Sequence, residues 1–130
     1  MKFFKLNKKG QSMVELALIL PVILLLFLGM FEFSRIFGSY LLVNHASREA
    51  ARMASIGKTD DEIKANVAAK VSTLDVKDLR VTLTPAYESR MTGDDVRVQI
   101  TYKVQIYAPV ISNLITNPFP MEADTYMRVE

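Results

Sequence analysis

Residues 8–33 read KKGQSMVELALILPVILLLFLGMFEF. The uncharged part of this stretch, 16–31, has 16 residues, slightly fewer than the ~20 that cross a bilayer. Counting the whole segment 11–33 gives enough length if Glu15 and Glu32 lie near opposite membrane surfaces. The pattern therefore predicts one membrane-spanning helix at residues 11–33.

Pro21 lies inside this predicted helix, where a proline removes one backbone hydrogen bond and favours a kink. Ahead of the helix, residues 1–10 read MKFFKLNKKG and contain four lysines and no acid. Because positive charge concentrates on the cytoplasmic side of membrane helices, we expect the N-terminus in the cytoplasm and residues 34–130 outside.

The junction between Gly10 and Gln11 predicts where the chain is processed. A secretory signal peptide also has a basic start and an apolar centre, but its small-residue cleavage site follows the apolar run. Here that position reads GMFEF, at residues 29–33, without a small-x-small pattern. A cut after Gly10 leaves the apolar helix on the mature protein, as prepilin peptidases do on the cytoplasmic side. We therefore interpret residues 1–10 as a prepilin leader.

Glu15 is an acid at the edge of an apolar segment, where it is costly unless it has a partner. After a cut behind Gly10 it is the fifth residue of the mature chain, one helical turn from the new amino group of Gln11. The functional hypothesis is that Glu15 pairs with that amine in a neighbouring subunit during assembly. In the simpler alternative, its carboxylate reaches the lipid headgroups.

Composition excludes several classes of protein. With 130 residues there is room for one small domain, and the absence of cysteine excludes a disulfide framework or a thiolate metal site. The formal charge is +2, with 16 basic and 14 acidic residues. Without the four leader lysines, 12 basic residues face the same 14 acids, so the mature chain carries about −2 and gives no sign of nucleic-acid binding.

Helical spacing continues beyond the membrane segment. Small residues recur every four positions at Ala46, Ala50 and Ala54, a pattern that permits close packing. We favour packing on the chain's own domain over a dedicated subunit interface. Gly57 is the predicted helix end, and residues 59–62 (TDDE) have the spacing of a capping box that starts a second, short helix.

The period then changes from helical to two, which is typical of strands. Apolar and polar residues alternate over 79–84, 96–106 and 121–129, with a turn-rich loop at 85–95 and a proline-bracketed apolar loop at 109–120. We expect an α+β domain with a three-stranded antiparallel sheet, one face against the helices and the other towards water.

The sequence lacks the combinations of residues that usually carry out catalysis. His45 is the only histidine, so a histidine-rich metal site is excluded and a Ser-His-Asp triad is disfavoured. The acids at 60–62 are explained by helix capping better than by a metal. We expect no enzymatic activity, no cofactor and no small-molecule substrate.

Three segments resemble the TadE-like family, the minor pilins or pseudopilins of tight-adherence (Flp-type) pilus systems. They are GQSMVELALILP at 10–21, EF at 32–33 and ASREAAR at 46–52, and beyond residue 59 the likeness is only in layout, with MRVE closing the chain. The resemblance implies cleavage by a dedicated prepilin peptidase and a role in pilus biogenesis and cell adhesion.

The partners it implies are that peptidase, other pilins or pseudopilins, the Tad assembly machinery and the bacterial cytoplasmic membrane. The subunit could enter the fibre, prime it or remain in the membrane. An alternative of another class is an unprocessed single-span protein whose outer domain binds another envelope protein.

Overall fold

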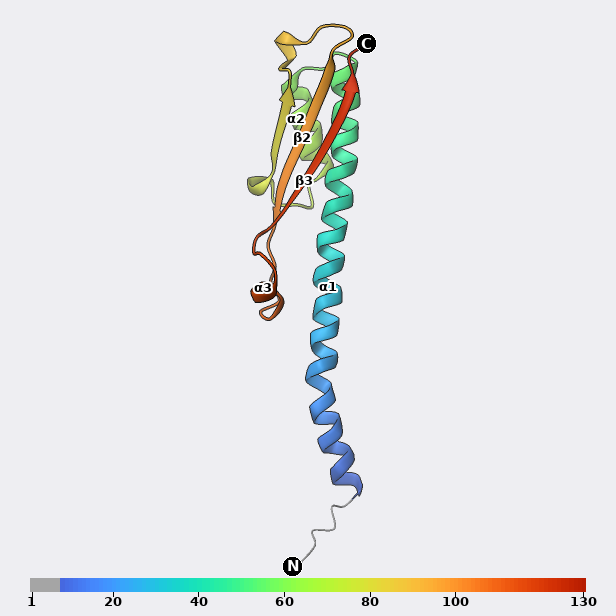
Figure 1. The fold of residues 1–130 in the computed structure, drawn as a ribbon, viewed down its shortest axis with the longest axis vertical. Coiled ribbons are helices and arrows are strands. Elements are labelled where there is room, and N and C mark those ends of the chain that lie inside the picture. Colours follow the sequence, from blue (N-terminus) through green and yellow to red (C-terminus); the bar gives the residue numbers. More distant parts are fainter. Residues whose placement is uncertain (1–7) are drawn as a thin grey trace, which may run out of the picture.

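The computed structural model describes residues 8–130 as one long helix with a small domain along its C-terminal half (Figure 1). The elements are α1 (Lys8–Ser55), α2 (Asp60–Lys70), the 3₁₀ helix η1 (Val76–Asp78), β1 (Arg80–Thr84), the 3₁₀ helix η2 (Tyr87–Ser89), β2 (Asp95–Val104), α3 (Ile111–Leu114) and β3 (Phe119–Arg128). This confirms the predicted α+β fold with a long first helix, a short second helix and a three-stranded sheet.

Helix α1 has 48 residues and is therefore about 72 Å long. Its described part starts at Lys8 and includes the whole predicted segment 11–33. Its end confirms the prediction at Gly57, which has φ +84°, a left-handed conformation that glycine adopts without a Cβ clash. The N–H groups of Gly57 and Lys58 donate to the carbonyls of Ala54 (3.3 Å) and Met53 (3.1 Å), which is the Schellman arrangement.

Helix α2 starts with the predicted capping box. The Glu62 N–H donates to Thr59 Oγ1, and the Thr59 N–H donates to Glu62 Oε2, both at 3.3 Å. The neighbouring Asp60 accepts hydrogen bonds from the Arg90 side chain and from the Tyr87 N–H, so this acid ties α2 to the loop between β1 and β2.

The sheet is an antiparallel meander in the order β1-β2-β3. The predicted strands at 79–84, 96–106 and 121–129 are each found within two residues at either end. One face of β2 is buried and carries Val96, Val98, Ile100, Tyr102 and Val104. The alternation of the sequence therefore correctly predicted which face meets the helices.

The small-residue stripe of α1 lies in the core. Ala46, Ala50 and Ala54 are at most 2% exposed and pack among buried residues of α2 and the sheet. Small side chains let the helix backbone approach the strands closely. Packing on the chain's own domain, the favoured interpretation of this stripe, is confirmed.

A buried polar contact fixes the helix on the sheet. Ser47 Oγ and Thr125 Oγ1 are 2.7 Å apart, joining α1 to β3. At the surface, Glu49 of α1 pairs with Lys70 of α2 at 3.0 Å. These contacts connect the C-terminal half of α1 to both other parts of the domain.

Candidate functional site

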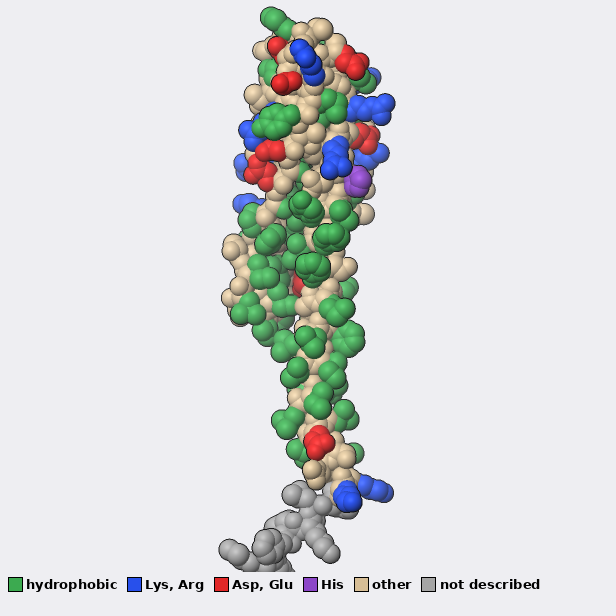
Figure 2. All heavy atoms as spheres, turned by 45° about the vertical axis from the view of Figure 1, so that its right-hand side comes forward, with side chains coloured by type: hydrophobic (Ala, Val, Ile, Leu, Met, Phe, Trp, Pro, Cys, Tyr) green, Lys and Arg blue, Asp and Glu red, His purple; other side chains and the backbone are tan. Residues whose placement is uncertain are grey.

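The N-terminal half of α1 is an uncovered apolar shaft. All residues from 8 to 28 are exposed. Figure 2 shows hydrophobic side chains along this shaft, whereas charged side chains gather over the domain. Within residues 8–130, α1 is the one helix long and apolar enough to cross a membrane, and none of its most apolar window is buried. A surface this apolar is stable only in lipid or against other apolar helices.

Gly10, Gln11 and Glu15 lie together at the start of α1. Gln11 Nε2 donates to Glu15 Oε1 at 3.2 Å, so both side chains share one face, a single turn apart. Glu15 is exposed, and a Cβ added to Gly10 would meet no atom within 4 Å. The structure thus brings the predicted processing and assembly residues together and leaves space around them.

The first turn of α1 is weakly held. Lys8 and Lys9 lie at the positive end of the helix dipole, and this turn contains no acid. Gly10 adds the backbone entropy cost of glycine in a helix, about 1 kcal/mol relative to alanine. These effects favour fraying at the predicted cleavage position. The preceding leader residues, 1–7, lie outside the described part of the chain.

Pro21 lies inside α1, and the backbone is helical on both sides of it. Its ring has no N–H to donate, so the carbonyl one turn earlier loses its helical partner. The kink at Pro21 stays a prediction.

Glu32 has a role that the sequence did not reveal. Although it lies at the C-terminal end of the apolar stretch, it is only 4% exposed, because the chain after β2 covers it. Glu32 Oε1 accepts the N–H groups of Tyr107 (3.0 Å) and Ala108 (3.1 Å). Its second oxygen, Oε2, lies 2.7 Å from Arg35 Nη1. Both carboxylate oxygens therefore have partners, as a buried charge requires.

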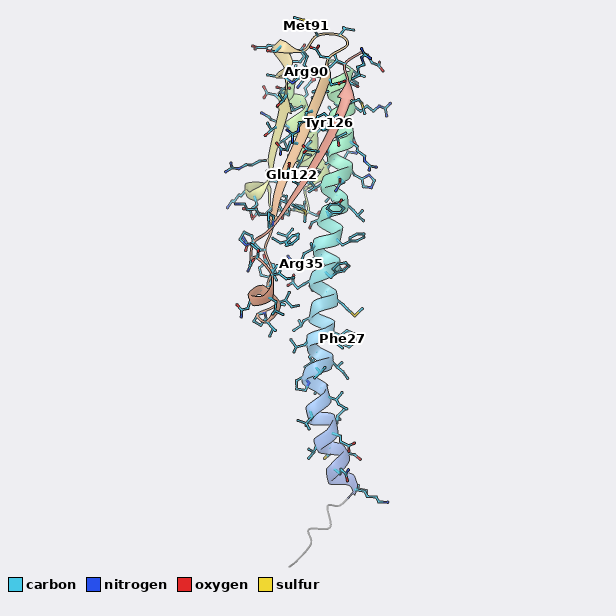
Figure 3. The ribbon with its side chains drawn as sticks, in the orientation of Figure 1. Phe27, Arg35, Arg90, Met91, Glu122 and Tyr126 are labelled. Carbon is cyan, nitrogen blue, oxygen red and sulfur yellow. The ribbon has the colours of Figure 1, made fainter. Side chains whose placement is uncertain are left out.

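Arg35 completes this arrangement. Its Nη2 donates to the Gln105 carbonyl at 3.2 Å, and its guanidinium lies 4.7 Å from the ring centre of Tyr107. Figure 3 shows Arg35 on α1, facing the segment that leads to α3. The Glu32–Arg35 pair thus fixes the chain after β2 against α1.

Asn117 binds the start of the same segment through its side-chain amide. Its Oδ1 accepts the Ile106 N–H at 3.1 Å, and its Nδ2 donates to the Ile106 carbonyl at 3.2 Å. No periodic pattern marks Glu32, Arg35 or Asn117, because their partners are far away in the sequence. The available signal was an acid at the end of an apolar run, and it was interpreted only as a membrane boundary.

Comparison with known proteins gives one family. The family model described as TadE-like protein matches residues 10–52, which covers Gly10, Glu15, Pro21, Glu32 and the alanine stripe. No curated protein and no solved structure matched the chain. The match lies within α1 and leaves the sheet unmatched. The resemblance of the N-terminal segment to the TadE-like family is therefore confirmed for residues 10–52.

Proposed function

We propose that this chain is a non-enzymatic minor pilin or pseudopilin of a tight-adherence (Flp-type) pilus, processed by a prepilin peptidase after Gly10. The family match suggests a Tad-associated protein and supports this assignment. In the proposal, α1 anchors the subunit in the bacterial cytoplasmic membrane, and the domain works outside, at the cell surface or in the fibre. Its partners are the peptidase, other pilins or pseudopilins, and the Tad assembly machinery.

The uncovered shaft of α1 is the observation that carries this proposal. Its residues 8–28 are exposed on every side, so the helix can exchange lipid neighbours for apolar helices of other subunits without unfolding the domain. Such an exchange is what a subunit needs when it leaves a bilayer and enters a fibre. The sheet and α2 lie along the other half of α1, and only the segment that contains α3 reaches down beside the end of the shaft (Figure 1).

Glu15 supplies the specific contact in this proposal. In the described chain its partner is the Gln11 side chain, a neutral amide. A cut after Gly10 gives Gln11 a positive amino group, which is a stronger partner for the carboxylate in an apolar surrounding. The neighbour's amine would then offset the cost of Glu15 inside a bundle of apolar helices.

Orientation follows from charge. Lys8 and Lys9 lie at one end of the shaft, and the domain lies at the other. By the positive-inside tendency, the lysine end stays in the cytoplasm. A reporter fused after Glu130 should therefore be active outside the cytoplasm, and protection of the domain from protease in spheroplasts would contradict this orientation.

Intact mass and N-terminal sequencing of the native protein test the processing step. The mature chain should begin at Gln11, and Gly10→Ala should leave the leader attached. Gly38→Ala is a matched control, because Gly38 also lies in α1 and an added Cβ there meets no atom within 4 Å. A native chain that starts at Met1 would show that the prepilin assignment is wrong.

The alternative is an unprocessed single-span protein whose domain binds another envelope protein. One observation favours it: α1 runs through Gly10 from Lys8 without a break, so a peptidase must first open that turn. The same N-terminal sequencing separates the two functions, since only the unprocessed protein retains its leader in the membrane fraction.

A further inference from the structure

The segment between β2 and β3 exposes an unusual amount of apolar surface. We name residues 107–116 the apolar loop; it contains α3. Tyr107, Val110, Leu114 and Ile115 are between 41% and 78% exposed. No residue between Lys103 and Glu122 is charged. An exposed apolar tip on a small domain is costly in water and marks a contact surface.

This loop lies beside the membrane helix. Ile111 Cδ1 is 3.6 Å from the position that a Cβ would take on Gly29, so the loop packs on the helix where that residue has no side chain. An apolar groove of about 520 Å³ runs between the two elements; its lining includes Leu25 and Met30 on α1 and Val110 and Leu114 on the loop. Along the axis of α1, the loop therefore lies beside residues that belong to the predicted membrane span.

The depth of the loop can be estimated along the helix axis. Gly29 and Leu25 precede Glu32 by three and seven residues, which corresponds to about 4.5 and 10.5 Å along the helix. Elements that rest in the membrane interface bury their apolar side chains by a similar ~5–10 Å. Arg35 and Tyr107, which are at least partly exposed, lie on the Glu32 side of the tip, where charged and aromatic groups can meet lipid headgroups.

The loop backbone suits this depth. The Ser112 and Ile115 N–H groups donate to the carbonyls of Ala108 (2.9 Å) and Ile111 (3.1 Å), and Ser112 Oγ donates to the Pro109 carbonyl (2.9 Å). Backbone groups without partners are the main cost of placing a loop near hydrocarbon. Here the turn of α3 reduces that cost.

We propose that the apolar loop inserts into the outer leaflet of the membrane beside α1, so that the subunit contacts lipid through two elements. The proposal rests on the membrane anchoring of the proposed function. Acyl chains are the occupant because, in the proposed anchoring, they surround α1 at the same level, and the groove is continuous with that surface of α1. The Glu32–Arg35 pair holds the loop at a fixed height and so sets the distance between domain and membrane.

Tryptophan fluorescence in vesicles tests this, since the chain contains no native tryptophan. The full chain is reconstituted in phosphatidylcholine–phosphatidylglycerol vesicles, with or without bromine on the upper acyl carbons. Three variants each carry one tryptophan: Leu114→Trp in the loop, Phe27→Trp in the shaft and Met91→Trp at the far end of the domain. Their native side chains are 78%, 65% and 72% exposed, so none fills the core. Figure 3 shows Phe27 on the shaft and Met91 at the opposite end of the molecule.

Leu114→Trp should emit at shorter wavelength than Met91→Trp, and bromine should quench it severalfold more strongly. Phe27→Trp should differ from Met91→Trp in the same two ways. If Phe27→Trp is quenched while Leu114→Trp behaves like Met91→Trp, the loop is in water and the inference is wrong, whereas the anchor stands. Emission at short wavelength without quenching would show that protein, such as a second copy, covers the loop. Absence of quenching at Phe27→Trp would overturn both the anchor and the inference.

Discussion

Glu32 Oε1 lies 3.1 Å from the backbone nitrogen of Ala108, 76 residues later in the chain. The same oxygen accepts the Tyr107 N–H, so one carboxylate at the C-terminal end of the apolar shaft fixes the start of the apolar loop. This contact joins the apolar helix α1 and the small domain into one connected unit.

Removing the Glu32 carboxylate should release the loop. Glu32→Ala leaves the Tyr107 and Ala108 N–H groups without their acceptor, and an unsatisfied buried donor costs about 1–3 kcal/mol. Hydrogen exchange of these two amides, measured on the full chain in detergent micelles, should accelerate by roughly tenfold to a hundredfold. Glu32→Gln, which keeps an acceptor oxygen, should accelerate it less.

Glu49→Ala is the control for this measurement. Its partner is Lys70, and both side chains are about half exposed, so losing the pair should cost at most about 1 kcal/mol. Exchange at Tyr107 and Ala108 should be unchanged in this variant. Equal exchange in Glu32→Ala and the wild type would show that the carboxylate does not hold the loop.

Glu15→Gln should prevent assembly and spare processing. The substitution keeps shape and hydrogen bonding but removes the charge, and an unpaired amine left in an apolar surrounding typically costs about 3–5 kcal/mol. Membrane insertion and cleavage after Gly10 should persist, while surface pili and co-purification with other pilins decrease. Glu15→Asp should recover little, because its carboxylate is one methylene shorter. Normal numbers of pili in Glu15→Gln would leave Glu15 as an interfacial residue only.

Ala50→Leu should destabilise the domain. Ala50 is fully buried where α1 meets the sheet, and extra methylene groups in a packed core cost about 1–3 kcal/mol. The midpoint of thermal unfolding, followed by circular dichroism in detergent, should therefore fall. Arg48→Leu places the same side chain on the exposed face of this helix and should have little effect. A similar midpoint in both variants would contradict close packing at Ala50.

The ion pair between β2 and β3 predicts a pH dependence. Arg97 Nη2 lies 2.8 Å from Asp124 Oδ2, and this hydrogen bond holds the pKa of the Asp124 carboxyl below its ordinary value. A carboxyl whose pKa is lowered by folding adds stability above its unfolded pKa, and that stability is lost as pH falls through the folded pKa. Carbonyl NMR should report a low pKa for Asp124 in the wild type.

Arg97→Gln should return the pKa of Asp124 towards its ordinary value. The stability difference between this variant and the wild type should be largest near neutral pH and shrink below the ordinary carboxyl range. Arg80→Gln, on the exposed face of the neighbouring strand β1, is the control and should leave the Asp124 titration unchanged. A titration unaffected by Arg97→Gln would exclude this pair as the cause.

The local elements of this fold were predictable because each is encoded by residues close in sequence. The apolar run, the capping box at Thr59 and the stop at Gly57 involve partners within about five residues. The strands follow from alternation, which also identifies their buried face. The candidate processing residues Gly10 and Gln11, together with Glu15, belong to this class, since one helical turn places Gln11 beside Glu15.

Tertiary structure alone determined which distant groups meet. Ser47 bonds Thr125, Arg90 reaches Asp60, and Glu32 reaches Ala108, across separations of 78, 30 and 76 residues. Periodicity reports on neighbours one or two turns away, and it contains no information about which loop returns to which helix face. The sequence alone therefore determined that an apolar helix, long enough to cross a membrane, carries a small α+β domain. Only the folded chain placed the apolar loop beside that helix, because packing of the sheet on α1 sets where the β2–β3 connection lies.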